Sequence, residues 1–86
     1  QNFLLNEREK IIAGRVYNFI LNKKKHLVKK EVSINKIKNI ILKLGVTKID
    51  YIKLLDINKL FKKTKNKKIK LFIAYYLRST RLIDNI

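Results

Sequence analysis

The feature that most constrains this 86-residue sequence is its longest apolar stretch, close to the carboxyl end. Residues 69–77 read Ile-Lys-Leu-Phe-Ile-Ala-Tyr-Tyr-Leu and are rich in β-branched and aromatic side chains. The stretch is too short to cross a membrane as a helix, so it predicts a buried strand. Arg78, Ser79 and Thr80 interrupt the pattern, and residues 81–86 then resume it. The two runs therefore predict a hairpin.

A first amphipathic helix is predicted from Asn6 onward. Asn6 is a candidate N-cap, and Glu9, three residues later, completes a capping box. Apolar residues then recur at helical spacing and predict one buried stripe. The stripe consists of Ile12, Val16, Phe19, Ile20 and Leu27. Lysines gather near the end of this helix, where cations suit the helix dipole, and His26 among them is expected to be exposed and without a special role.

A second helix is predicted after Ser33, a further N-cap candidate. Its apolar stripe consists of Ile34, Ile37, Ile40, Ile41 and Leu44. Gly45 follows and suits the left-handed residue that ends a helix. Because the connection around Glu31 and Val32 is short, we expect the two helices to lie antiparallel.

The period changes from helical spacing to strict alternation over residues 47–55, which predicts the first strand. The alternation places Ile49 with Tyr51 on one face and Asp50 with Ile52 on the other. Residues 56–59 are typical of a turn. Leu60 and Phe61 are expected to form an anchor, and the lysine-rich residues 62–68 a loop.

These elements predict an α+β fold, in which two antiparallel helices pack on a three-stranded antiparallel sheet in the order helix-helix-strand-strand-strand. Residues 69–77 should be the central strand, because they are apolar on both faces. The helix pair covers one of these faces. Phe72, Ala74 and Tyr76 on the other have no obvious cover within the chain, which points to a missing neighbour.

Several classes of protein are disfavoured by composition. The chain has no cysteine and one histidine, so it offers neither a disulfide nor a thiolate metal site. No apolar run is long enough for a membrane helix, and the first residues do not resemble a secretory signal. We therefore expect a soluble, cytoplasmic protein without a membrane partner. Because the sequence begins at Gln1 and contains no methionine, we interpret it as a piece of a larger protein.

The net charge of +16 suggests a nucleic-acid-binding domain as an alternative function. Such a domain would use residues 23–30 and 62–70, with Tyr75 or Tyr76 as stacking partners. However, the chain has 18 Lys, 14 Ile and 9 Asn, all with A/T-rich codons, and only four Arg. We therefore interpret the charge as genomic drift and expect no specific nucleic acid partner. A membrane-surface role is disfavoured because the basic runs lack interleaved large apolar residues.

Three motifs resemble the pantoate–β-alanine ligase (pantothenate synthetase) family. The segment Ser79-Thr80-Arg81-Leu82-Ile83-Asp84-Asn85 resembles the closing signature of that family, Thr-Arg-Leu-Ile-Asp-Asn after an apolar strand. Phe3-Leu4 followed by Glu7-Arg8-Glu9 is similar to the Tyr-Leu-x-x-x-x-Arg opening of its carboxyl-terminal domain. Ile49-Asp50-Tyr51-Ile52, with Asp56 and Leu60, is similar to its Val-Asp-Tyr-Val strand and the turn that follows. One departure is Arg78, which stands where the family often has Gly. Because Arg tolerates positive φ poorly, the turn geometry of the family is not carried over to this residue.

The resemblance implies a ligase that activates pantoate with ATP as pantoyl adenylate, after which β-alanine displaces AMP to give pantothenate. It implies ATP and magnesium for the full enzyme, and no cofactor bound to these 86 residues. The whole chain would be the carboxyl-terminal lid domain of a two-domain enzyme whose amino-terminal nucleotide-binding domain is absent. No catalytic, cofactor-binding or metal residue is carried over, so the fragment alone should be inactive. Arg81, Asp84 and Asn85 are candidate contacts with the amino-terminal domain, and Arg81 and Asp84 are expected to lie close enough to support each other.

Overall fold

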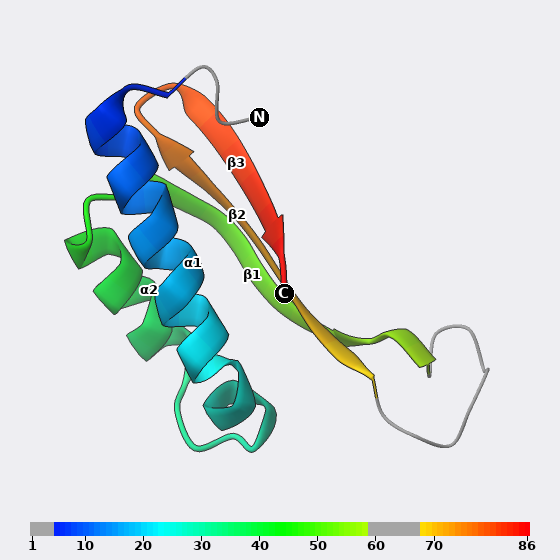
Figure 1. Cartoon of the computed structure of the whole chain (residues 1–86). Coiled ribbons are helices and arrows are strands. Elements are labelled where there is room, and N and C mark those ends of the chain that lie inside the picture. Colours follow the sequence, from blue (N-terminus) through cyan, green and yellow to red (C-terminus); the bar gives the residue numbers. More distant parts are fainter. Residues whose placement is uncertain (1–4, 59–67) are drawn as a thin grey trace.

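A computed structural model of the chain describes residues 5–58 and 68–86. Its elements are α1 (Glu7–Val28), α2 (Ile34–Lys43), β1 (Lys48–Asp56), β2 (Ile69–Leu77) and β3 (Thr80–Asn85). The strands form one antiparallel sheet in the order β1-β2-β3. Both helices lie on the same side of this sheet, so the fold has two layers (Figure 1). The predicted α+β class, the order of elements and the central position of β2 are confirmed.

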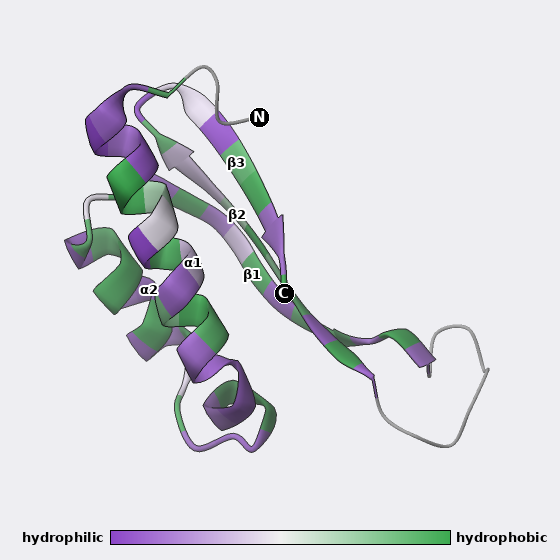
Figure 2. Ribbon diagram, in the orientation of Figure 1, coloured by the Kyte–Doolittle hydropathy of each residue, from purple (hydrophilic) through white to green (hydrophobic). Residues whose placement is uncertain are grey.

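The start of α1 is fixed by the predicted capping box. Glu9 N donates to Asn6 Oδ1 at 2.8 Å, and Asn6 N donates to Glu9 Oε1 at 3.0 Å. These two bonds satisfy backbone donors that the first helical turn leaves without a partner. Val16, Ile20 and Leu27 of the predicted stripe are buried. Figure 2 shows many hydrophilic residues in the turns at both ends of α1, although Leu27 in the last turn still belongs to the core.

The second helix, α2, starts and ends at the predicted residues. Ser33 Oγ accepts a hydrogen bond from Lys36 N at 3.2 Å, and Gly45, with φ of +117°, follows the last turn. Ile37 and Ile41 are fully buried. In Figure 1, α2 runs back alongside α1, which agrees with the antiparallel arrangement expected from the short connection.

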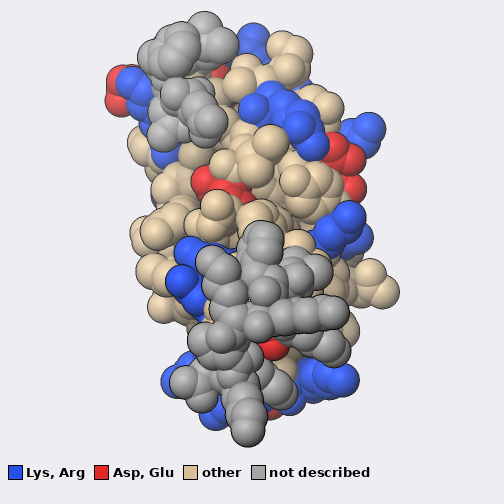
Figure 3. All heavy atoms as spheres, turned by 90° about the vertical axis from the view of Figure 1, so that its right-hand side faces the viewer, with Lys and Arg blue, Asp and Glu red and all other residues tan. Residues whose placement is uncertain are grey.

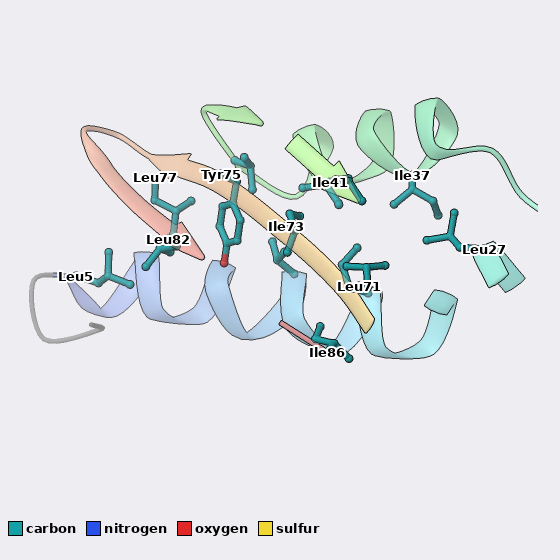
Figure 4. Packing of buried hydrophobic residues seen from close by; sticks show 14 residues of the cluster. Leu5, Leu27, Ile37, Ile41, Leu71, Ile73, Tyr75, Leu77, Leu82 and Ile86 are labelled. Carbon is teal, nitrogen blue, oxygen red and sulfur yellow. The ribbon is translucent and has the colours of Figure 1, made fainter. Parts of the chain in front are cut away.

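The core lies between the helices and the central strand. Four alternate residues of β2 are buried and face the helix layer, as strand geometry requires. They are Leu71, Ile73, Tyr75 and Leu77. Figure 4 shows the side chains of this strand in one cluster with those of α1 and α2, and the hydroxyl end of Tyr75 directed toward α1. The core therefore depends on the alternation along β2.

The first strand departs from strict alternation. Its pairing with β2 shifts between Ile49 and Tyr51, so Asp50 occupies a β-bulge. The extra residue brings Ile49 into contact with the core together with Ile52 and Leu54. The expectation that Ile49 shares a face with Tyr51 is therefore wrong, because a bulge changes the phase of the strand.

The β2–β3 turn is shorter than expected. Only Arg78 and Ser79 form the turn, and β3 begins at Thr80 instead of residue 81. Arg78 adopts φ of +59° despite its side chain, and its N–H donates to Thr47 Oγ1 at 2.9 Å. The hairpin therefore keeps a left-handed turn residue without Gly. The predicted anchor at Leu60 and Phe61 and nearly all of the predicted loop lie outside the described residues.

Candidate functional site

The sheet has one side that faces away from both helices, and we call it the open face. The register of the strands arranges its side chains in three rows that cross the sheet. The rows are Lys48-Tyr76-Arg81, Tyr51-Ala74-Ile83 and Lys53-Phe72-Asn85. The open face therefore has an aromatic and aliphatic middle with polar or charged residues at its ends.

The middle of the open face is only partly shielded from solvent. Ala74 is fully buried, whereas Phe72 and Tyr76 are half-buried and Ile83 is 46% exposed. Among residues 5–58 and 68–86, no helix or strand packs on this side of the sheet. Figure 3 shows this side of the molecule, where uncharged residues and a few Asp and Glu lie between Lys and Arg in the part that is not drawn in grey. A face of this composition is typical of a surface that meets another protein part.

Two lysines lie over the aromatic rings of the open face. Lys48 Nζ is 5.7 Å from the ring centroid of Tyr76, and Lys53 Nζ is 5.3 Å from that of Tyr51. At these distances a cation is attracted by the negative face of the ring. These contacts hold the lysine stems along the sheet, so the face presents apolar area and positive charge together.

Arg81 joins the two edge strands across the open face. Its Nη2 and Nε lie 2.9 Å and 3.2 Å from the same oxygen, Oδ2 of Asp50. The guanidinium carbon is also 6.0 Å from the ring centroid of Tyr51. The hydrogen bond to Asp50 raises the pKa of Arg81 above its already high ordinary value, so the side chain carries a permanent charge.

The structure places Asp84 on the other side of the sheet from Arg81. Asp84 lines a cavity of about 290 Å³ between α1 and β3, together with Lys10, Asn18 and Tyr75. Burial raises the pKa of the Asp84 carboxyl group above its usual range. The expectation that Arg81 and Asp84 support each other is therefore wrong, because residues three apart on a strand point to opposite faces. Asn85 lies on the open face, opposite Phe72.

Tyr75 also faces the helices, with an exposed fraction of 1%. Burial raises the pKa of its hydroxyl, and the nearby carboxylate of Asp84 adds to the effect. A side chain in this position cannot stack on a nucleic acid base, so the alternative hypothesis loses one of its two tyrosines. Tyr76 remains on the open face.

Two features of the surface were missed by sequence reasoning. His26 Nδ1 lies 2.7 Å from Glu31 Oε1, so this histidine has a specific partner beyond the end of α1. The bulge at Asp50 was also missed, although the sequence contains a signal for it. Core apolar residues occur at Ile49 and then at Ile52, and a spacing of three within a strand indicates an extra residue.

The described ranges offer no group of three or more His, Cys, Asp or Glu side chains that could hold a metal ion. Within the same ranges, neither helix is long and apolar enough to cross a membrane.

Comparison with known proteins gives one consistent result. A sequence model of the family described as pantoate-beta-alanine ligase matches residues 1–86. The chain is also 36% identical over 90 residues to a pantothenate synthetase from Campylobacter hominis, a match that covers 100% of this chain and 32% of that protein. The chain thus spans about a third of the length of that relative. No solved structure gives a significant match. The chain belongs to the pantoate–β-alanine ligase family.

Proposed function

We propose that this chain is the carboxyl-terminal lid domain of an ATP-dependent pantoate–β-alanine ligase. The observation that carries the proposal is the family match over all 86 residues, combined with coverage of only 32% of the pantothenate synthetase relative. In the proposed reaction, the pantoate carboxylate attacks the α-phosphorus of ATP and releases pyrophosphate. The amine of β-alanine then attacks the pantoyl adenylate, an amide bond forms, and AMP leaves.

The chemistry of these two steps is assigned to the rest of the ligase. Adenylate formation requires donors that stabilise charge on the phosphates in the transition state, and ATP is expected to be bound there with magnesium. This sequence contains a single histidine and no glycine-rich phosphate loop. We therefore expect the 86 residues to make no pantothenate and no AMP when they are assayed alone.

The contribution of the lid would be to exclude water from the acyl adenylate until β-alanine attacks it. An acyl adenylate hydrolyses readily, and a domain that closes over it protects it and aligns it with the amine. The open face is the surface best suited to meet the rest of the ligase. It presents apolar area from Phe72, Tyr76 and Ile83, and Arg81 and Asn85 lie at its ends.

A chimeric enzyme tests this assignment. The carboxyl-terminal third of the Campylobacter hominis pantothenate synthetase is replaced by these 86 residues, and pantothenate formation is measured. Ile83→Asp puts a charge on the open face at a site that is 46% exposed, and Leu21→Asp is the matched control on α1 at 49% exposure. We expect Ile83→Asp to lower turnover by about tenfold, equivalent to about 1.4 kcal/mol, because the charge must be desolvated on closure. Equal effects of the two substitutions would refute a closing role for the open face.

A further inference from the structure

Three of the four arginines of this chain line a single cavity. The cavity has a volume of about 710 Å³ and lies between the first half of α1, the end of α2 and the β2–β3 turn. Arg8, Arg15 and Arg78 line it together with Lys43, and we call it the arginine cavity. The fourth arginine, Arg81, is on the open face and is bound to Asp50.

The general basicity of the chain does not explain this cluster. Of its 22 cationic residues, 18 are lysines that are distributed along the whole sequence, whereas arginine is scarce. A guanidinium group donates five N–H bonds in a planar fork that matches the oxygens of a phosphate group. The convergence of three scarce arginines on one cavity therefore indicates recognition of an oxyanion. Lysines spread along the whole chain would not indicate this.

The cavity has an excess of positive charge that the described residues do not neutralise. Glu9 is the one carboxylate among its lining residues. Its Oε1 accepts the hydrogen bond from Asn6 N, and its Oε2 lies 3.8 Å from Arg78 Nε. Within residues 5–58 and 68–86, Arg8, Arg15 and Lys43 have no ion-pair partner.

Arg78 lines the arginine cavity from an uncommon backbone conformation. Its φ of +59° lies in the left-handed region, where Gly is the default residue and a long side chain is unfavourable. The conformation is held by the hydrogen bond from Arg78 N to Thr47 Oγ1 and by the pairing of β2 with β3. An unfavourable conformation at a residue that lines a charged cavity points to a function for its side chain.

We propose that the arginine cavity binds a small phosphate-bearing anion, with pyrophosphate as the simplest member of the class. The cavity volume falls within the range of small-molecule sites, about 300–1,000 Å³, so it has room for more than a single phosphate group. Its lining comes mostly from the helix layer and the connections next to it, not from the open face. Binding at this site therefore does not depend on the lid role.

Titration of pyrophosphate into the 86-residue chain at about 150 mM salt tests the proposal, with binding followed by calorimetry and by NMR of the backbone amides. We expect one saturable site, with the largest amide shifts at Gly45, Thr47 and Arg78. Arg15→Gln should weaken binding about five- to tenfold, because it removes a charge-assisted hydrogen bond. Lys36→Gln also removes one positive charge, but Lys36 lies on α2 about two turns before the cavity residue Lys43. This variant should therefore weaken binding less than about twofold.

Arg78→Gly separates binding from folding. It removes the guanidinium group and relaxes the left-handed backbone, so the thermal midpoint should not fall while pyrophosphate affinity drops about five- to tenfold. Citrate, a carboxylate of similar charge, should bind more weakly than pyrophosphate. Absence of saturable binding, equal losses for Arg15→Gln and Lys36→Gln, or equal affinity for citrate would each overturn the proposal. None of these results bears on turnover by the chimera, so the two proposals fail separately.

Discussion

Arg81 on β3 binds Asp50 on β1 across the full width of the sheet, with its Nη2 2.9 Å and its Nε 3.2 Å from Asp50 Oδ2. The two residues are 31 positions apart in the sequence, and β2 lies between their strands. Asp50 is the extra residue of the β1 bulge, and its carboxylate is exposed. It is therefore accessible to the guanidinium group of Arg81. The pair therefore links both edges of the open face.

The exposure of this pair predicts a small, salt-dependent effect on stability. Asp50→Asn should lower the urea midpoint slightly at about 50 mM salt, and the difference should disappear near 1 M salt, because exposed charges are screened. In an Arg81→Gln background the same substitution should have no effect. A double-mutant cycle from urea unfolding measures this coupling. A large loss that persists at high salt would show that Asp50 has a different structural role.

The core predicts much larger effects. Ile41→Ala and Ile73→Ala should each lower the free energy of unfolding by about 2–5 kcal/mol, because both side chains are fully buried between the helices and the sheet. Since a domain of this size has a total stability on the order of 5 kcal/mol, either variant is expected to be partly unfolded. Leu42→Ala, at 43% exposure on the same helix as Ile41, is the matched control and should change stability by less than about 1 kcal/mol. Urea unfolding followed by circular dichroism distinguishes the cases, and losses below about 0.5 kcal/mol at both buried sites would contradict the layer arrangement.

Substitution of the two glycines by Ala should change the stability of the fold in opposite directions. At Gly45, φ of +117° is unfavourable for any side chain, and a Cβ would lie 2.9 Å from Ile12 Cδ1. Gly45→Ala should therefore destabilise the fold by at least about 1 kcal/mol. Gly14 lies within α1 and an added Cβ would meet nothing within 4 Å, so Gly14→Ala should stabilise the fold by about 0.5–1 kcal/mol. Thermal unfolding of both variants tests the prediction, and shifts in the same direction would contradict it.

Removal of the Asp84 charge should increase the thermal stability of the fold in a pH-dependent way. Burial raises its pKa in the folded state above the ordinary value of 3.8, so the ionised carboxylate opposes folding at neutral pH. Below 3.8 the group is protonated in both states and the penalty disappears. Asp84→Asn should therefore raise the thermal midpoint near about pH 7, and the gain should shrink as the pH falls through the folded pKa.

The titratable groups that line the same cavity as Asp84 come from two elements, Lys10 and Tyr17 on α1 and Tyr75 on β2. Lys10 Nζ lies 3.6 Å from Glu7 Oε1. Thermal unfolding of the Asn variant and of the parent chain across the acid range measures the effect. A lower midpoint for the variant near about pH 7 would indicate that one of these groups stabilises the charged carboxylate more than burial opposes it.

The elements could be predicted from the sequence because their signals are local. The capping box of Asn6 and Glu9, the cap at Ser33 and the left-handed Gly45 each depend on residues within a few positions. Local signals also placed Phe72 and Tyr76 on a face without cover. They could not assign Arg81 to Asp50, because that contact depends on the register of two strands with a third between them.

The arginine cavity could not be predicted from the sequence for the same reason. The arginine cavity joins Arg8 and Arg15 of α1 to Arg78 of the β2–β3 turn, and nothing in the spacing of these residues indicates that they converge. The partnership expected for Arg81 and Asp84 is wrong because residues close in sequence on a strand need not be close in space. On a strand, an odd separation places two side chains on opposite faces.

The most direct test of the lid assignment compares three proteins in one assay for AMP and pantothenate. They are the chimera, its amino-terminal part without these 86 residues, and the 86-residue chain alone. If the 86 residues are the lid, the chain alone should form neither product. The amino-terminal part alone should turn over more slowly than the chimera and release more AMP than pantothenate, because the unprotected adenylate is hydrolysed. Pantothenate formation by the chain alone, or an amino-terminal part as fast and as well coupled as the chimera, would contradict the lid assignment.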